Sequence, residues 1–317
     1  MNGFMNTHIP EKSKVAISFP GRSDFRVVPP NEAYVRVFDR SFHFGDSVYE
    51  VVRTYDGVLF GMKEHTDRLR NSMKLGLWAH LPDFSLIERM IKDTCRQYFS
   101  EFGRKDLYVR VTVSRGIGDT NIDPTTCGQP YAVVIAKEIP PAPDWHATKG
   151  VEFATVQRRR NSHEALPPSM KSGNYLNNVL AIVEAKHNGG SDAVMVNAHG
   201  FVTEGTTNNL FIVKNGVVWT PSMDAGILEG ITRAMILNLC RQHKIPVEER
   251  LFTIQDVFSC EELFLSSTTR EIVPITKLDG QAIGNAKPGP VTVSLRKLLR
   301  EHIASEVKKQ PSLFEMV

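Results

Sequence analysis

The sequence is poor in cysteine, lacks a long apolar run and carries little net charge. Its four cysteines lie far apart in 317 residues and form no CxxC pair, which argues against a disulfide framework and a zinc site. No stretch reaches the roughly 18 apolar residues of a membrane span, and the N-terminus has no continuous apolar core of a signal peptide. We therefore expect a cytoplasmic protein with reduced thiols and no bound metal.

The charge balance is also informative. A formal net charge of +3, without a basic run interleaved with aromatic residues, indicates neither nucleic acid nor an anionic membrane as a partner. The densest basic cluster is Arg158–Arg160. We expect this cluster to be a solvated loop, with the border of an anionic site as the alternative.

The chain is long enough for two domains, and its 41% hydrophobic and 23% charged residues are typical of a soluble protein. Three prolines within residues 139–143 exclude regular structure and predict a linker between the domains. The predicted organisation is an N-terminal arm over residues 1–30, a small domain over 31–138, a linker over 139–149 and a C-terminal domain over 150–317.

Periodicity predicts both helices and strands in each domain. In the small domain we expect strands at 34–38, 107–113 and 131–136, a hairpin turn at Asp56-Gly57, and helices at 63–73 and 86–99. In the C-terminal domain we expect strands at 151–156, 193–197, 210–213, 217–219 and 262–266, and helices after Lys171, at 231–243 and at 291–304. This mixture predicts an α+β or α/β fold.

Lys171 is the residue around which the functional prediction is built. It lies in the stretch 167–178, after two prolines that stiffen the backbone and before a helix. Four apolar residues predict that one face of this helix is buried: Tyr175, Val179, Ile182 and Val183. Burial would help such a lysine to lose its proton and attack a carbonyl carbon. A surface lysine in a turn is the alternative.

Four other segments contain groups that an aldehyde cofactor with a phosphate would need. Glu204 ends a strand, and its carboxylate could meet a heterocyclic nitrogen. Residues 226–233 place two glycines and a Thr at a helix start, where backbone N–H groups favour a phosphate. Residues 266–269 offer hydroxyls, and Arg68 offers a charged contact. The structural alternatives are a turn Glu, a capped Gly turn, a polar strand end and a solvated Arg.

In this order the five segments resemble the class IV, fold-type IV pyridoxal-phosphate aminotransferases. The resemblance covers roughly residues 34 to 300 and depends on five motifs. They are Glu-His-x-x-Arg-Leu, Lys-Ser-x-Asn-Tyr-Leu-x-Asn, Thr-Glu-Gly, Glu-Gly-Ile-Thr-Arg and Ser-Ser-Thr-Thr. The family implies a smaller N-terminal α/β domain, a larger barrel-like C-terminal domain, pyridoxal 5'-phosphate between them, and a homodimer that completes the site.

The resemblance also implies the roles of individual residues. Lys171 carries the internal aldimine and later moves the proton between the substrate carbon and the cofactor, while Glu204 contacts the pyridine nitrogen. Tyr175 lies beside the cofactor ring. The residues implied to hold the phosphate are Arg68, Ile231, Thr232 and Thr268.

The residues implied to bind the substrate match two different subgroups of the family, some positions one subgroup and some the other. Tyr108 and Arg110 are similar to the carboxylate-handling pair of branched-chain aminotransferases. Other residues are similar to those of D-amino-acid aminotransferases. They are Phe44, Tyr49, Val51 and the run Ser266–Thr269, in which Thr269 is a substrate candidate. Val51 should narrow the substrate pocket, and Arg270 adds a cation beside this run that offers another carboxylate contact.

We therefore predict a transaminase that passes an amino group from an amino acid to a 2-oxo acid such as 2-oxoglutarate. Branched-chain L-amino acids are the first candidate substrates, D-amino acids the second and (R)-selective primary amines the third. Two other classes of protein are kept open, a lyase that resembles aminodeoxychorismate lyase and a non-catalytic pyridoxal-phosphate-binding protein.

Overall fold

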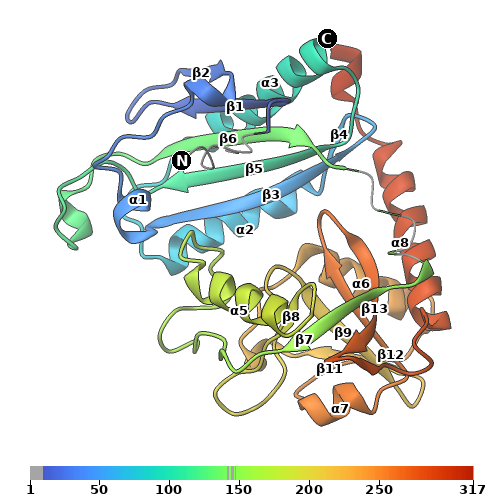
Figure 1. The fold of residues 1–317 in the computed structure, drawn as a ribbon. Coiled ribbons are helices and arrows are strands. Elements are labelled where there is room, and N and C mark those ends of the chain that lie inside the picture. Colours follow the sequence, from blue (N-terminus) through green and yellow to red (C-terminus); the bar gives the residue numbers. More distant parts are fainter. Residues whose placement is uncertain (1–9, 141–142, 144–145, 147, 317) are drawn as a thin grey trace, which may run out of the picture. The chain divides into compact units, whose positions relative to one another are not determined.

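The computed structural model describes residues 10–140, 143, 146 and 148–316. The described residues form two compact units, one from the start to Pro140 together with Val307 onward, and the other from Pro143 to Glu306. Each unit contains its own sheet (Figure 1). The predicted linker over residues 139–149 lies partly outside the described residues.

The first unit contains a six-stranded antiparallel sheet in the order β2-β1-β6-β5-β3-β4. The strands are β1 (Ser13–Ser18), β2 (Phe25–Val28), β3 (Ser47–Tyr55), β4 (Val58–Phe60), β5 (Leu107–Ser114) and β6 (Tyr131–Glu138).

The prediction of an extended arm over residues 1–30 is wrong for the described residues 13–28, which form β1 and β2. Every residue of β1 is buried, because the strand pairs with β2 on one side and β6 on the other. The predicted strand at 34–38 is also absent. This segment contacts no neighbouring strand, and Tyr34, Val35, Val37 and Phe38 are exposed.

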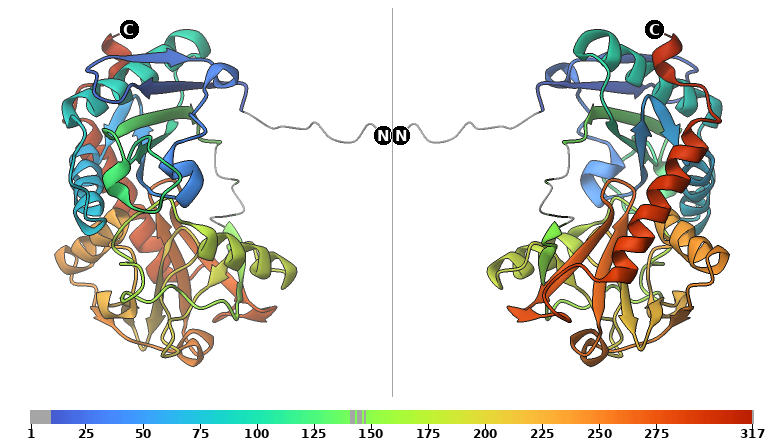
Figure 2. Two further views of the ribbon diagram at one scale, coloured as in Figure 1. Left: turned by 90° about the vertical axis from the view of Figure 1, so that its left-hand side faces the viewer. Right: turned by 90° about the vertical axis from the view of Figure 1, so that its right-hand side faces the viewer.

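Helices α2 (Met62–Leu75) and α3 (Phe84–Phe102) lie on the same face of this sheet, as Figures 1 and 2 show. Their apolar stripes are buried there, including Leu69 and Met73 of α2 and Met90 of α3. Both helices were predicted from this periodicity. The unit also contains the short helix α1 (Arg40–Phe44) and two 3-10 turns, η1 (Pro30–Glu32) and η2 (Pro124–Thr126).

The second unit contains a mixed sheet in the order β11-β10-β9-β12-β13-β7-β8, with β14 paired to β13. Two of its parallel contacts join β13 to β7 and β7 to β8, whereas β9, β12 and β13 are antiparallel neighbours. The strands are β7 (Val151–Thr155), β8 (Ala193–Val194), β9 (Asn209–Lys214), β10 (Val217–Pro221), β11 (Val247–Arg250), β12 (Glu262–Ser267), β13 (Glu271–Leu278) and β14 (Gln281–Ala282).

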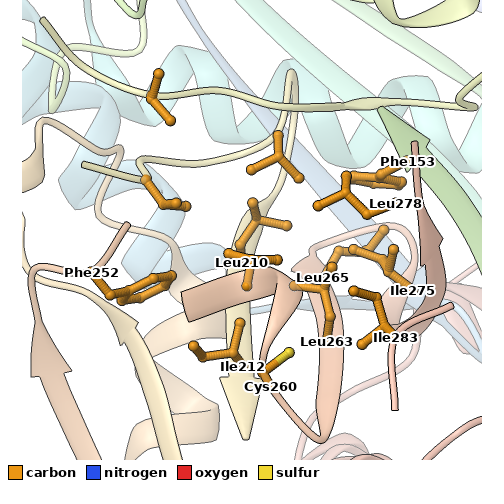
Figure 3. Close-up of a cluster of buried hydrophobic side chains, with 14 of the residues drawn as sticks. Phe153, Leu210, Ile212, Phe252, Cys260, Leu263, Leu265, Ile275, Leu278 and Ile283 are labelled. Carbon is orange, nitrogen blue, oxygen red and sulfur yellow. The ribbon is translucent and has the colours of Figure 1, made fainter. Parts of the chain in front are cut away.

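A cluster of buried hydrophobic side chains lies against this sheet and forms a core of the second unit (Figure 3). Alternate residues of β12, Leu263 and Leu265, point into it together with Leu210 and Ile212 of β9. Phe153 of β7 closes the cluster and is fully buried. This packed core fixes the positions of β7, β9, β12 and β13, and therefore of the ends of the loops that connect them.

The helices of the second unit are α5 (Leu176–His187), α6 (Ile231–Gln242), α7 (Ile254–Phe258) and α8 (Pro290–Val307), with the 3-10 turn η3 (Met223–Ala225). Helix α6 packs against β12 and β11. The predicted helices after Lys171, at 231–243 and at 291–304 are all present.

The buried face predicted for α5 is wrong. Val179 and Val183 are about half exposed, and the buried residues are Asn178, Ala181 and Ala185. The two alanines pack against β7 and β8, where small side chains let the helix approach the strands closely. The larger apolar side chains consequently point outward, and α5 lies at the outside of its unit (Figure 2).

The last residues also differ from the predicted C-terminal domain of 150–317, because residues 307–316 belong to the first unit. The 3-10 turn η4 (Leu313–Met316) follows α8, and the Leu313 N–H donates to the Gly57 carbonyl at 3.0 Å. The Phe314 ring packs edge-on against Phe99 of α3, at 4.7 Å between ring centroids.

None of the helices that the structure describes is long and apolar enough to cross a membrane. Across the same described residues, no group of three or more His, Cys, Asp and Glu side chains could hold a metal ion.

Candidate active site

Lys171 lies in the loop that leads into α5 and is half-buried. Its Nζ lies 5.7 Å from the centroid of the Tyr175 ring, the residue that precedes the first turn of the helix. Asn178, one turn further, is buried and donates to the Thr206 carbonyl at 2.7 Å. This bond ties α5, the helix that follows the Lys171 loop, to the loop that follows Glu204.

Glu204 is buried, and both of its carboxylate oxygens accept hydrogen bonds. Oε1 accepts from Nε and Nη2 of Arg160 at 3.0 and 2.9 Å. Oε2 accepts from the Leu228 N–H at 3.1 Å and from Asn209 Nδ2 at 3.4 Å. The exposed turn glutamate considered above is therefore excluded, because this carboxylate is held at the centre of a hydrogen-bond network.

Arg160 is the partner that the sequence interpretation did not identify. Its side chain is only 10% exposed, and its Nη1 donates to Asn178 Oδ1 at 3.3 Å. Its neighbours Arg158 and Arg159 are exposed, as expected for a solvated loop. The run of three arginines signalled an anionic neighbour as the alternative, and the Glu204 carboxylate is that anion.

The start of α6 offers unused backbone donors. Gly230 caps the helix without a side-chain hydrogen bond to the first-turn N–H groups, where Ile231 and Thr232 lie. A Cβ added at Gly230 would approach Asn209 Oδ1 to 1.9 Å, so glycine is required for this close packing. Ser266 Oγ is buried and has no hydrogen-bond partner among the described residues.

The turn between β12 and β13 contains Thr268, Thr269 and Arg270, all half-buried. It follows Ser266, whose Cα pairs with that of Asn209 in the sheet. Arg270 Nη2 forms an ion pair with Asp192 Oδ2 at 3.3 Å. The turn is therefore linked to the same loop region as Glu204.

Four of the predicted substrate residues share one face of the sheet in the first unit. Val51 of β3 is the Cα partner of Arg110 on β5, and Tyr49 and Tyr108 lie two residues along each strand. The Arg110 guanidinium lies 3.7 Å from the centroid of the Tyr49 ring, and its Nε donates to Thr112 Oγ1 at 3.1 Å. Helices α2 and α3 cover the opposite face.

Phe44, the remaining substrate candidate of this unit, ends α1 and is half-buried. The guanidinium of Arg40 lies 4.7 Å from the centroid of its ring. Arg40 is itself buried and donates to the carbonyls of Asn121 and Ile122 at 2.8 Å. This contact fixes the Phe44 ring against the loop that follows β5.

Arg68 projects from α2 toward Glu50 of β3. Its Nε and Nη2 donate to Oε1 and Oε2 of Glu50 at 2.7 and 2.8 Å. Burial alone would raise the pKa of the Glu50 carboxyl, but the charge and hydrogen bonds of Arg68, together with His65, lower that pKa to about 2. Arg68 is thus a held cation rather than a solvated one, and Glu50 is the partner that the sequence did not reveal.

The second unit therefore brings together α5, which follows the Lys171 loop, the Glu204 loop, the start of α6 and the β12–β13 turn. The first unit independently brings together Tyr49, Val51, Tyr108 and Arg110. A half-buried lysine, a fixed carboxylate and an uncapped helix start are the groups that an aldehyde cofactor with a basic ring nitrogen and a phosphate requires. Fold and site together define the class of a pyridoxal-phosphate enzyme.

Comparison with known proteins specifies the family. The model of amino-transferase class IV matches residues 47–278, and the chain belongs to this family. A putative branched-chain-amino-acid aminotransferase of Methanocaldococcus jannaschii is 38% identical over 276 residues, covering 87% of this chain and 93% of that protein. A D-alanine aminotransferase of Bacillus licheniformis is 32% identical over 289 residues, covering 90% and 97%.

Solved structures agree with the predicted fold type. The branched-chain amino acid aminotransferase of Escherichia coli superposes with a TM-score of 0.80 at 28% identity, covering 88% of this chain and 92% of that one. The branched-chain enzyme of Thermobaculum terrenum, in its pyridoxal-phosphate form, gives 0.77 at 28% identity, covering 88% and 92%. The predictions of a fold-type IV architecture, an aminotransferase and a pyridoxal 5'-phosphate cofactor are confirmed.

The residues of this chain fit that cofactor. The unpartnered Ser266 hydroxyl and the uncapped start of α6 both lie next to Asn209, and they offer donors that a phosphate would need. Glu204 is held as an acceptor by Arg160, which suits contact with a protonated ring nitrogen. When bound, the cofactor supplies an electron sink for the carbon that loses its proton.

Proposed function

We propose that the protein is a transaminase that moves an amino group from an amino acid to a 2-oxo acid such as 2-oxoglutarate. The observation that carries the proposal is the network that joins Asn178, on the helix that directly follows the Lys171 loop, through Arg160 to Glu204. It fixes the Glu204 carboxylate and links it to the start of the helix that follows the Lys171 amine, and covalent catalysis with proton transfer requires such positioned groups.

Each site residue has a proposed role. Lys171 is the amine that holds the aldehyde cofactor and then carries the proton to and from the substrate carbon. Glu204 contacts the ring nitrogen, and Tyr175 lies beside the ring. The residues that hold the phosphate are Arg68, Ile231, Thr232 and Thr268. Asn178 and Arg160 touch no reacting atom and position Lys171 and Glu204.

Branched-chain L-amino acids are the proposed donors. Tyr108 and Arg110 would take the carboxylates of the donor and of 2-oxoglutarate, and Val51, on the same face of the sheet, would limit the side chain that fits. The pairing of Arg110 with the Tyr49 ring supports a positioned rather than a solvated guanidinium. The putative branched-chain relative at 38% identity supports the same choice.

A D-amino acid is the second candidate donor. Phe44, Tyr49, Val51 and Thr269 resemble that subgroup, and a D-alanine aminotransferase is 32% identical. An (R)-selective primary amine is the third candidate. The three donors differ in stereochemistry and in the presence of a carboxylate, so they are separated by a direct assay.

We also propose a cytoplasmic homodimer. Large apolar side chains are exposed on α5 and along residues 34–42, including Leu176, Val179 and Phe42. Such exposure is typical of surfaces that a partner covers. The four cysteines are unpaired, which supports a reducing compartment.

The test is the absorption spectrum of the purified protein with pyridoxal phosphate, mixed separately with L-leucine, D-alanine and (R)-1-phenylethylamine. We expect the visible band of the bound cofactor in the wild type, and its conversion to the aminated form with L-leucine. Lys171→Ala should lack both, because no other amine replaces it. Lys186→Ala, which removes an exposed lysine of α5, is the matched control and should behave as the wild type.

Conversion by D-alanine alone would replace the branched-chain assignment with the second candidate. Conversion without any dependence on a 2-oxo acid acceptor in turnover would favour the lyase. A visible band in Lys171→Ala equal to that of the wild type would contradict the central role of Lys171.

A further inference from the structure

Arg270 is a cation whose hydrogen-bonding capacity is only partly used. Its Nη2 donates to Asp192 Oδ2 at 3.3 Å and to Thr207 Oγ1 at 3.4 Å. A guanidinium has further N–H groups on Nε and Nη1. For Arg270 these groups have no hydrogen-bond partner within the described part of the chain, and the side chain is 35% exposed. Donors are therefore left over that a solute can reach.

Asp192 does not depend on Arg270 for its own hydrogen bonds. Its Oδ1 accepts from the N–H and the hydroxyl of Thr206 at 3.1 and 2.6 Å, and from the Ala193 N–H at 2.8 Å. Its Oδ2 accepts from Asn208 Nδ2 at 2.8 Å. All four bonds are shorter than the one to Arg270. Asp192 therefore contacts one nitrogen of the guanidinium, while other groups supply most of the hydrogen bonds to its carboxylate.

The location of Arg270 connects it to the reactive residues. It directly follows Thr268 and Thr269 in the turn, and its contact Thr207 belongs to the loop that follows Glu204. The neighbouring Thr206 carbonyl accepts from Asn178 on α5, the helix that follows the Lys171 loop. Arg270 is thus held against the loop that joins the two proposed catalytic groups.

The positive charge of Arg270 also reaches beyond Asp192. Burial, and next the charge of Arg270, lower the pKa of His146 in the same unit. Arg270 therefore acts electrostatically on a second side chain besides Asp192. A partly exposed cation with unused donors is suited to bind a carboxylate.

We propose that Arg270 binds a carboxylate of the substrate, with Asp192 and Thr207 as its positioning residues. This proposal rests on the proposed function and adds the substrate class: Arg270 favours amino acids and 2-oxo acids over amines that lack a carboxylate. The carboxylate is either the one next to the reacting carbon or the second one of a dicarboxylic acid, and the same chemistry serves both.

The test measures the binding of inert acids to the protein loaded with pyridoxal phosphate, by titration calorimetry. The probes are valerate with one carboxylate, glutarate with two, and valeramide with none. Arg270→Gln should raise the dissociation constant of a carboxylate probe about tenfold, as expected for a partly exposed charged contact, and leave valeramide unchanged. For Arg270→Lys the dissociation constant of a carboxylate probe should lie between those of the wild type and Arg270→Gln, because this variant keeps the charge but loses the planar donors.

Arg300→Gln is the matched control. Arg300 is a half-exposed arginine that pairs with Glu271, the residue after Arg270, at 2.8 Å, so this change removes the same charge close by. It should leave all three dissociation constants unchanged. The unfolding midpoint of each variant shows whether its fold is intact.

If Arg270→Gln loses affinity tenfold for both valerate and glutarate, Arg270 binds the carboxylate next to the reacting carbon. If it loses affinity for glutarate alone, Arg270 binds the second carboxylate of a dicarboxylic acid. Equal losses for valeramide, unchanged binding of both acids in Arg270→Gln, or no binding of either acid to the wild type would overturn the proposal. Because the probes do not react, a wild type without transaminase activity would refute the proposed function while this binding result still stood.

Discussion

Each unit contains a largely buried arginine–glutamate pair, and the two pairs differ in how many carboxylate oxygens the arginine contacts. In the first unit Arg68 donates to both oxygens of Glu50, at 2.7 and 2.8 Å, and His65 is the third contact at 2.7 Å. In the second unit Arg160 donates twice to a single oxygen of Glu204, at 3.0 and 2.9 Å. The second oxygen of Glu204 is left to neutral N–H groups.

This difference in contacts agrees with the role that we propose for one residue of each pair. Glu50 fixes an arginine that we propose to hold a phosphate, and Arg160 fixes a glutamate that we propose to contact the ring nitrogen. In both cases the sequence singled out the residue with the proposed role and not its partner. The partners are 18 and 44 residues away, so no local pattern joins them.

The largest effect is expected from removing Arg160. Arg160→Met leaves the buried Glu204 carboxylate without its cation, and we expect a loss of about 4 kcal/mol in the free energy of unfolding. Urea unfolding measures this loss. The double variant Arg160→Met/Glu204→Gln should recover most of it, because no unpaired charge remains. A double variant as unstable as Arg160→Met would contradict the explanation.

The first pair is expected to respond to acid. Because the pKa of Glu50 is lowered from 4.5 to about 2 in the folded protein, the unfolded chain binds the proton first as the pH falls. This contribution to stability is complete above about pH 4.5 and is lost as the pH approaches 2, amounting to roughly 3 kcal/mol.

Unfolding free energies measured across this pH range, in the wild type and in Glu50→Gln, test the prediction. The variant should be less stable near neutral pH, and its difference from the wild type should shrink as the pH falls. A constant difference between the two proteins at every pH would show that the Glu50 charge is not involved.

The smallest effects are expected from replacing each arginine by lysine. Arg68→Lys loses a two-oxygen contact that only a planar guanidinium makes, and should cost about 2 kcal/mol. Arg160→Lys can still reach the single oxygen Oε1 and should cost about 1 kcal/mol. Equilibrium unfolding ranks the two variants, and the reverse order would show that the geometric difference has no energetic meaning.

The residues of the proposed site could be selected from local sequence patterns, whereas parts of the fold around them could not. Lys171 and Glu204 stood out because a lysine before a helix and a glutamate before a glycine turn are local patterns. The start of α6 was proposed for the same reason, since two glycines and a threonine mark a helix N-terminus. The structure connects these three segments by hydrogen bonds that local sequence does not specify.

The errors in the fold also arise from non-local contacts. Residues 13–28 look like an irregular arm, and they become strands only because β6 pairs with β1. Helix α5 buries its alanines instead of its valines because β7 and β8 allow a close approach. The last ten described residues leave the second unit to pack on Gly57 and Phe99.

The sequence by itself determined the kind of elements, the family resemblance and the identity of the proposed reacting lysine. These properties depend on residue type and short spacing, which the chain carries wherever it folds. Only the tertiary structure decided that Arg160 supports Glu204, that Glu50 supports Arg68 and that Arg270 keeps free donors. Partners of this kind are chosen by burial, because a charge removed from water must find a counter-charge wherever the fold brings one.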